Sequence, residues 1–453
     1  MSQNAIIVND SLIIICLMIR KVMNFKKIAL IQGFICSLAA VFIYLIPKEA
    51  KSIASQGKTY VVIGSSAAGR GAVKELTKKA LPNDHIILIS KEEFYDKTRL
   101  KKYIKKNRLP LLSCPVQKKA PIRVIHDEVI SVKRHTKEVI CKNGTIISYD
   151  CLFLGIGAEP ITPTIKGMNE VYGIFGYYNL ANVRAIKQYI ESHQVKSIAV
   201  IGSGLASLEI TAALTAQGYQ VHHCVRGQRI LKDKADDNGA QHIQNIFKKN
   251  GVQWHFNTEI TQVKSVNNHI TEIILNNQDE MPIDMMIYAI GSTVNTHLVE
   301  GLNTRQGAFS VDSYMRTNDP FIYTGGDAAC VWDYVNECFT RSGKWTLAEE
   351  QGCCAAKNMC GQKTPYEGVA CVNFAQYFKT LVAFSGPVNN PPLNYTYTSH
   401  ASKSWLLKIT DSFLETKDGY RIFLKKNGLL KGFCLVDVTF REILNYKQAL
   451  NKK

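Results

Sequence analysis

The chain has 453 residues, of which 46% are hydrophobic, enough for several buried cores and two or three domains. Its 55 Lys and Arg against 37 Asp and Glu give a formal net charge of +18, which favours anionic partners. No zinc-finger spacing or RNA-binding signature points to nucleic acid. The 13 cysteines are an odd number without a CxxC pair or metal-ligand spacing, which excludes a disulfide-stapled secreted domain and predicts no metal site.

The first distinctive element is an uncharged run, residues 28–46, flanked by Lys27 and Lys48. It is long enough for one membrane-spanning helix, although a cleavable signal segment is the alternative. Basic residues on both sides leave the orientation open. A weak preference for an inside N-terminus would place the enzyme outside the cytoplasm, whereas the cysteine usage favours the cytoplasm. We expect residues 1–57 to be an N-terminal extension that associates the protein with a membrane, with the cytoplasmic side favoured.

The first nucleotide-binding pattern follows a polar linker. A strand over 59–63, a turn, a helix to about residue 81 and a strand over 85–90 predict a βαβ unit. The turn and the helix start consist of Gly64, Ser65, Ser66, Ala67, Ala68 and Gly69. Such a turn directs the free N–H groups of the helix N-terminus at a pyrophosphate. Ser66 replaces the middle glycine of GxGxxG, and Glu92 or Glu93 fits the acid that binds ribose hydroxyls.

The pattern recurs with strands over 196–201 and 221–225 on either side of a helix over 205–217. Its turn and helix start contain Gly202, Ser203, Gly204, Leu205 and, in place of the third glycine, Ser207. Two such units in one chain indicate two dinucleotides, or one dinucleotide bound twice.

The end of the second strand in this later unit bears on cofactor choice. A carboxylate there would bind the ribose 2′-OH of NAD, but the residue is Val225. Arg226, with Arg229 or Lys232, could instead make charge-assisted bonds to a 2′-phosphate. The sequence therefore favours NADPH over NADH.

From these turns to the C-terminus, the chain resembles the FAD-dependent pyridine nucleotide-disulfide oxidoreductase superfamily. The closest likeness is to its branch of rubredoxin and ferredoxin reductases and apoptosis-inducing factor, over about residues 58–445. The resemblance implies FAD and a nicotinamide dinucleotide as cofactors. It also implies cofactor contacts at Gly157 and Gly291, in the two crossover motifs, and at Gly326 and Asp327, in the late FAD motif.

The segment 95–102 resembles the YxRPxLSK motif of this branch. Lys102 matches its lysine, and Glu209 matches the acid of the nicotinamide motif. The resemblance implies that these two residues are catalytic and pair beside the flavin ring, where a cation stabilises the reduced flavin. Lys97 stands where the branch has arginine and is expected to contact the cofactor.

Disulfide chemistry is not expected. Disulfide reductases of the superfamily carry CxxxxC early in the FAD domain, and its peroxidases carry one cysteine after the second strand. Residues 94–108 contain no cysteine, and the vicinal pair Cys353-Cys354 is expected to serve packing. The basic run 97–108 is either a solvated face or a docking patch for an acidic electron carrier.

The expected fold is α/β, with two Rossmann-like dinucleotide-binding domains and a C-terminal α+β interface domain. The FAD domain would comprise residues 58–175 and 299–365, the NAD(P)H domain 176–298 and the interface domain 366–453.

The expected function is that of an FAD-dependent NAD(P)H:acceptor oxidoreductase. Hydride would pass from nicotinamide to flavin N5, and electrons then to an iron-sulfur protein, a rubredoxin-like carrier or a quinone. The alternative is a redox-sensing interaction protein similar to apoptosis-inducing factor, with slow turnover and a change in oligomeric state such as a homodimer. A third interpretation is a flavoprotein that keeps the fold without turnover.

Overall fold

The computed structural model describes residues 57–106, 122–341, 343–389, 396–401, 420–427 and 429–450, without the side chains of 102, 105, 106 and 396–401. The chain divides into two units, Met1–Gln56 and Gly57–Lys453. The predicted membrane segment 28–46 lies outside the described residues. Among the helices that the structure describes, none is long and apolar enough to span a membrane.

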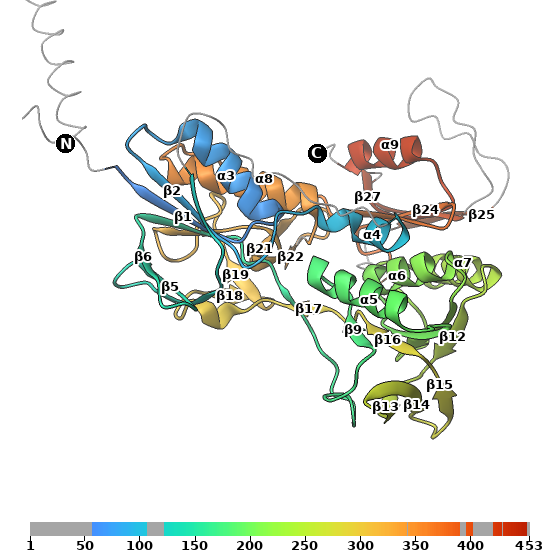
Figure 1. Ribbon diagram of the computed structural model, residues 1–453. Coiled ribbons are helices and arrows are strands. Elements are labelled where there is room, and N and C mark those ends of the chain that lie inside the picture. Colours follow the sequence, from blue (N-terminus) through green and yellow to red (C-terminus); the bar gives the residue numbers. More distant parts are fainter. Residues whose placement is uncertain are drawn as a thin grey trace, which may run out of the picture. The chain divides into compact units, whose positions relative to one another are not determined.

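The first α/β domain is built on a parallel five-stranded sheet in the order β20-β7-β1-β2-β3. Figure 1 shows its strands β1 and β2 next to each other. Its central strands have near-continuous apolar sequences such as TYVVI and HIILI, as expected for strands covered on both faces. Strand β20 comes from much later in the chain, so two separated segments form this domain. The strands are β1 (Thr59–Ile63), β2 (His85–Ile89), β3 (Ile122–Ile125), β7 (Cys151–Leu154) and β20 (Ile322–Thr324).

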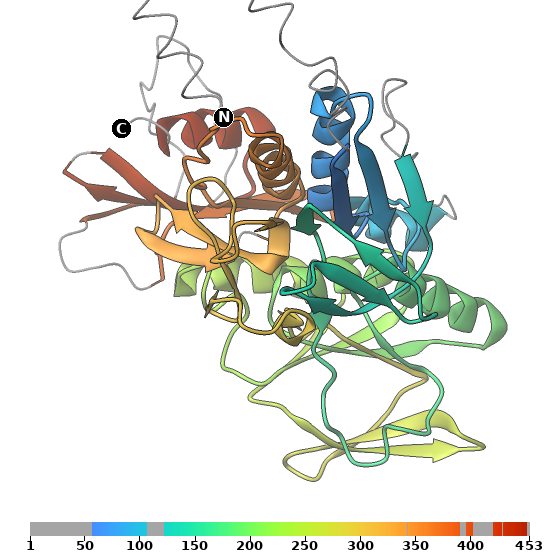
Figure 2. The ribbon, with the colours of Figure 1, turned by 90° about the vertical axis from the view of Figure 1, so that its left-hand side faces the viewer.

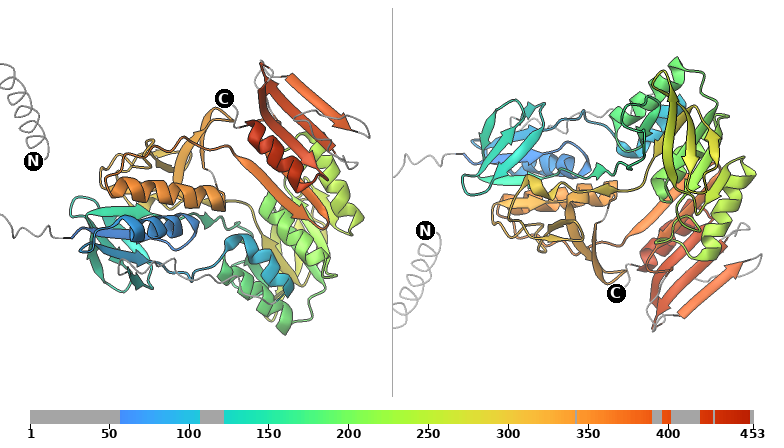
Figure 3. Two further views of the ribbon diagram at one scale, coloured as in Figure 1. Left: turned by 90° about the horizontal axis from the view of Figure 1, so that it is seen from above. Right: turned by 90° about the horizontal axis from the view of Figure 1, so that it is seen from below.

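Helices α3 (Ala67–Lys79) and α8 (Trp345–Met359) run side by side on this sheet (Figure 3). They approach closely because glycines face the partner helix. A Cβ on Gly352 would lie 2.0 Å from the carbonyl oxygen of Ala68, and a Cβ on Gly71 would lie 2.2 Å from that of Glu349. The contact brings the start of α8 next to the first glycine turn.

The second domain repeats this architecture. Its parallel sheet has the order β12-β11-β10-β16-β9, in which β10 has the central position that β1 has in the first sheet. The strands are β9 (Ile174–Gly176), β10 (Ser197–Ile201), β11 (Gln220–Val225), β12 (Gln253–Phe256) and β16 (Met285–Tyr288), and the helices are α5 (Leu180–Ser192), α6 (Leu205–Thr215) and α7 (Asp237–Lys249).

Small antiparallel sheets accompany both domains. One has the order β4-β5-β6, another β13-β14-β15, a third β18-β19-β21-β22, in which only β19 and β21 are parallel, and β8 pairs with β17. Their bounds are β4 (Val129–Lys133), β5 (Glu138–Cys141), β6 (Ile146–Ser148), β8 (Glu159–Pro160), β13 (Ile260–Val266), β14 (His269–Leu275), β15 (Glu280–Pro282), β17 (Ser292–Thr293), β18 (Thr304–Arg305), β19 (Ala308–Ser310), β21 (Ala329–Asp333) and β22 (Cys338–Arg341).

The C-terminal domain is an antiparallel sheet in the order β23-β24-β27-β26-β25, with α9 along one face (Figure 2). Alternation along β26 separates two cores, because successive side chains point to opposite faces. Ile422 and Leu424 join Phe247 of α7, whereas Phe423 packs with Tyr446 of α9. The elements are β23 (Val372–Tyr377), β24 (Thr380–Ser385), β25 (Thr396–Ala401), β26 (Tyr420–Lys426), β27 (Leu429–Val436) and α9 (Phe440–Leu450).

The predicted α/β fold class is confirmed. The first helix ends at Lys79, two residues earlier than expected, because Ala80 is extended and Pro82 follows. The helix of the second unit likewise ends at Thr215, before Gly218 with its φ of 92°.

Candidate functional site: two glycine turns and a joining pocket

The two glycines of the first turn are packed so tightly that neither position admits a side chain. Gly64 has φ 96°, and a Cβ there would lie 2.2 Å from the carbonyl oxygen of Gly155. A Cβ on Gly69 would lie 1.8 Å from the carbonyl oxygen of Gly64. Ser66, the N-cap of α3, makes no side-chain capping bond. The first N–H groups of α3 therefore have no side-chain cap, as a pyrophosphate site requires.

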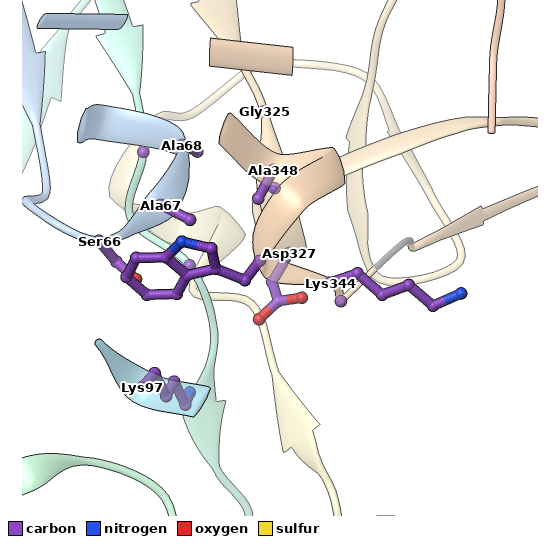
Figure 4. Close-up of a pocket in the computed structure, with 13 residues that line it drawn as sticks. Ser66, Ala67, Ala68, Lys97, Gly325, Asp327, Lys344 and Ala348 are labelled. Atoms are coloured by element: carbon purple, nitrogen blue, oxygen red, sulfur yellow. The ribbon is translucent and has the colours of Figure 1, made fainter. Parts of the chain in front are cut away.

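A pocket joins this turn to the late motif (Figure 4). Asp327, in the 3-10 turn Gly326–Ala328, directs its carboxylate toward the space between the turn and Lys97 in this view. Glycines supply much of the lining, so a ligand could approach the backbone closely. The lining residues are Ser66, Ala67, Ala68, Lys97, Gly155, Gly157, Gly325, Gly326, Asp327, Gly343, Lys344, Trp345 and Ala348.

The late motif is held by helix α8. The N–H of Gly326 donates to Oε1 of Gln351 at 2.7 Å, and Gly326 has φ 71°. Gly157, which follows the carboxyl end of the neighbouring parallel strand β7, has φ 66° and open space where a Cβ would stand. These glycines leave an open cradle beside an anion-binding helix start and a carboxylate. The residues present therefore fit a flavin dinucleotide.

Lys97 places a partly buried cation in this pocket. Its Nζ lies 3.2 Å from the centroid of the Tyr178 ring. Burial lowers the pKa of Lys97 to about 8, although Asp327 and Glu92 favour its charged form. A bound diphosphate would add a further anion next to this ammonium.

Lys97 predicts a pH dependence of FAD retention. Its ammonium is present below its pKa and is lost as the pH rises above about 8. Because a bond to a charged group contributes about 1.5–3 kcal/mol, FAD affinity should fall about tenfold or more between pH 8 and pH 10. Equilibrium dialysis of FAD across this range measures the effect. Lys97→Arg, which stays charged, should remove the pH dependence; an equal fall in that variant would contradict the assignment.

Sequence reasoning missed Lys344, the N-cap residue of α8. Its Nζ is buried without a hydrogen-bond partner among the described residues, and burial lowers its pKa to about 8. The side chain points away from Asp327 (Figure 4). Nothing in the sequence distinguishes it from a solvated lysine, since its burial comes from segments remote in the chain.

The two acids expected near the ribose have other partners in the structure. Glu92 accepts hydrogen bonds from the hydroxyl of Tyr95 at 2.9 Å and from Nδ2 of Asn179 at 3.2 Å. Glu93 pairs with Arg184 at 2.9 Å. Asn179 caps α5 and Arg184 lies within it, so both carboxylates connect the first domain to the second. A ribose contact by either acid stays a prediction.

Helix α4 (Leu100–Lys106) carries a further link between the domains. Leu100 and Ile104 are buried with Val183 and Ile210 of the second domain. Figure 3 shows α4 next to α5. Lys101 lies 3.1 Å from the carboxylate of Glu209, with the two side chains 25% and 29% exposed. The partner expected for Glu209 was Lys102, whose side chain is outside the described residues. The structure thus gives Glu209 the neighbouring lysine as its ion-pair partner.

The second glycine turn combines a crowded start with an open end. Gly202 has φ 143°, and a Cβ there would lie 2.5 Å from the carbonyl oxygen of Ala289. A Cβ on Gly204 would have no atom within 4 Å, and α6 begins directly afterwards at Leu205 without a side-chain cap. Gly291, in the second crossover, has φ 117°. A ligand phosphate could therefore reach the backbone at Gly204.

Arg226 and Arg229, which follow β11, differ in how far their side chains are exposed to a ligand. The side chain of Arg226 is 85% exposed, and its Nε lies 3.8 Å from Glu259. Arg229 is 18% exposed, pairs with Asp237 at 2.7 Å and donates to the carbonyl of Ala235. Arg229, expected as a phosphate contact, is thus engaged within the protein, and Arg226 is the available arginine.

The cysteines of the described part are free thiols. Cys353 Sγ donates to the carbonyl of Gly71 at 3.3 Å, and Cys354 Sγ to that of Thr364 at 3.3 Å. Burial raises the pKa of both thiols, that of Cys354 to about 11. Neutral, hydrogen-bonded thiols are poor nucleophiles, which agrees with the packing role expected for the pair. Within the described ranges, no group of three His, Cys, Asp or Glu is arranged to hold a metal ion.

Cys353→Ala/Cys354→Ala should leave NADPH consumption within about twofold of the unmodified rate, because neutral thiols do not take part in exchange. Steady-state assays with ferricyanide measure this. A loss of two electron equivalents, that is one NADPH per protein, from anaerobic titrations of the double variant would show that the pair is redox-active.

Two parallel sheets, each with a glycine turn after its central strand, β1 or β10, define a protein that binds two dinucleotides. The chain belongs to the pyridine nucleotide-disulphide oxidoreductase family, whose profile matches residues 58–352. The resemblance drawn from the motifs is therefore confirmed, and FAD with NADH or NADPH are the cofactors of this family.

Relatives include apoptosis-inducing factor 3 of Homo sapiens, 24% identical over 72% of this chain and 55% of the relative. Rubredoxin-NAD(+) reductase of Pseudomonas putida is 25% identical over 53% of this chain and 62% of the relative. The chain spans about half the length of the curated relatives it matches. The solved ferredoxin reductase of Rhodopseudomonas palustris shares the fold, with a TM-score of 0.73 and 20% identity over 87% of this chain and 95% of that chain.

Proposed function

We propose that this protein is an FAD-dependent NAD(P)H:acceptor oxidoreductase that works without a redox-active disulfide. The observation that carries the proposal is the pair of glycine turns, at Gly64 and Gly202, each on its own parallel sheet. When bound, FAD supplies the hydride-accepting chemistry and passes electrons one or two at a time to the acceptor.

The protein's own contribution is to hold and align the two dinucleotides. The helix starts at Ser66 and Gly204 bind pyrophosphates, and Asp327 and Lys97 face the flavin pocket. The Lys101–Glu209 pair joins α4 of the first domain to α6 of the second and so fixes the distance between the two binding units. Lys102 remains a candidate for the cation beside the flavin.

NADPH is the favoured donor. The strand end carries Val225, so no carboxylate repels a 2′-phosphate, and the exposed Arg226 follows it. A parallel exists among the structural relatives. A water-forming NADH oxidase and its engineered NADPH-using variant differ by five substitutions, which remove one aspartate and introduce two arginines.

Arg226→Ala should lower kcat/KM for NADPH by about tenfold or more and leave that for NADH nearly unchanged, since one charge-assisted bond contributes about 1.5–3 kcal/mol. Ferricyanide reduction with each nucleotide measures both values. Lys248→Ala, which removes another exposed cation of the same domain, is the control. Equal kcat/KM values for the two nucleotides in the unmodified protein would contradict the preference.

The acceptor class rests on charge and on the relatives. An acidic iron-sulfur or rubredoxin-like carrier suits the net charge of +18, and relatives include the rubredoxin reductase above and a putidaredoxin reductase solved with putidaredoxin. A quinone is the other candidate. Electron transfer to an acidic carrier should slow as salt rises, whereas quinone reduction should not.

Two further proposals concern membrane association and an alternative function. Residues 28–46 would anchor the protein to a membrane with the catalytic part on the cytoplasmic side, and carbonate extraction with protease protection tests both points. The alternative of a redox sensor, suggested by the likeness to apoptosis-inducing factor 3, requires slow ferricyanide turnover and a nucleotide-dependent change in oligomeric state.

A further inference from the structure

Three carbonyl groups of the second glycine turn each accept a hydrogen bond from a different part of the domain. The carbonyl of Gly204 accepts from the hydroxyl of Ser207 at 2.8 Å. That of Ser203 accepts from the N–H of Leu231 at 2.8 Å. That of Gly202 lies 2.7 Å from Nε2 of His223 on β11. A turn that binds an anion must point its carbonyls away from the ligand, and these three bonds do so.

His223 is fixed between this carbonyl and a second partner. It is fully buried, and its Nδ1 lies 2.9 Å from the hydroxyl of Thr211 on α6. Because a carbonyl can only accept, Nε2 carries the proton and Nδ1 accepts from Thr211. Burial lowers the pKa of His223 to about 4, so the ring is neutral at physiological pH.

The first turn shows that the fold itself does not require a histidine here. His223 pairs in register with Val200 of β10, and Leu88 pairs in the same way with Val62 of β1. Leu88 is also fully buried, but apolar. The polar contact therefore belongs to the second turn alone.

The second turn, which has this histidine contact, also lacks the third glycine of the motif. In the first turn, a Cβ on Gly69 would lie 1.8 Å from the carbonyl oxygen of Gly64. The second turn has Ser207 at this position, so its first carbonyl cannot take the same place. Gly202 accordingly has φ 143° where Gly64 has φ 96°, and its carbonyl bonds to His223.

We infer that His223 is a positioning residue for nicotinamide dinucleotide binding, which holds the carbonyl of Gly202 away from the pyrophosphate and so compensates for Ser207 in place of glycine. The inference rests on the proposed function, since it assigns the nicotinamide dinucleotide to this turn.

The test measures NADP⁺ dissociation constants of the FAD-loaded protein by calorimetry, together with KM and kcat for NADPH. His223→Leu, which copies the first turn, should raise the dissociation constant and KM about tenfold, the scale of one unsatisfied buried carbonyl. The kcat at saturation and the FAD content should stay within about twofold, because the bond does not touch the flavin site. His223→Gln, whose amide can donate to Gly202 and accept from Thr211, should restore binding.

Ser207→Gly provides the sharpest control. Combined with His223→Leu, it should recover most of the lost affinity, because the carbonyl of Gly202 could then adopt the geometry of the first turn. Thr211→Val removes the hydrogen bond to Nδ1 of His223 and should weaken NADP⁺ binding about threefold. It is the variant to use if His223→Leu does not fold. Unchanged binding in His223→Leu or in Thr211→Val would overturn the inference, and failure of the unmodified protein to bind either nucleotide would instead overturn the proposed function.

Discussion

Gly69→Val is expected to yield a folded protein that purifies without FAD. A Cβ at this position would lie 1.8 Å from the carbonyl oxygen of Gly64, so α3 must move away from the turn. The helix start would then no longer direct its N–H groups at the pyrophosphate. The ratio of flavin to protein absorbance in the purified sample measures the loss.

Folding must be checked separately, because the same clash strains the first domain. Far-ultraviolet circular dichroism and the retained binding of NADP⁺ by the second domain serve this purpose. A Gly69→Val protein that keeps a full complement of FAD would show that the flavin pyrophosphate does not bind at this turn.

Gly204→Val is expected to keep FAD but to lose rapid reduction of the flavin by a nicotinamide dinucleotide. The structure has open space at this position and ordinary backbone geometry, so the fold should tolerate the side chain and FAD should be retained. The added methyl groups would occupy the space that a pyrophosphate needs. Reduction of the flavin by NADPH and by NADH should therefore slow by about a hundredfold, the scale of a misplaced substrate.

Stopped-flow absorbance after anaerobic mixing gives this rate. Dithionite should still bleach the flavin, which shows that the first site is intact. Lys248→Ala, at an exposed residue of α7 in the same domain, is the control and should be reduced at the normal rate. If Gly204→Val is reduced as fast as that control, the second turn is not the nicotinamide site.

The regular parts of both domains follow from local sequence. The strands Thr59–Ile63 and Ser197–Ile201 lie within one residue of their predicted positions, because each apolar run ends at a glycine that a tight turn requires. The partner strand β20 could not be placed this way. It joins β7 across an inserted domain, and such long-range pairing has no local signal.

The site was less accessible to sequence reasoning. The motif match assigned Lys102 to Glu209, whereas the structure pairs Glu209 with the neighbouring Lys101, and a sequence match does not fix which of two adjacent lysines reaches a carboxylate on another domain. Glu92 fits the spacing of a ribose ligand, but its partner Asn179 lies far along the chain. Arg229 is likewise engaged by Asp237, which lies beyond the strand end that suggested the phosphate contact.

The central claim is that a nicotinamide dinucleotide on the second turn reduces FAD on the first. Anaerobic titration of the FAD-loaded protein, followed by flavin absorbance, tests it directly. The account predicts complete bleaching by an equimolar amount of NADPH, faster than by NADH. A flavin that dithionite bleaches but an excess of either nucleotide leaves oxidised would contradict it.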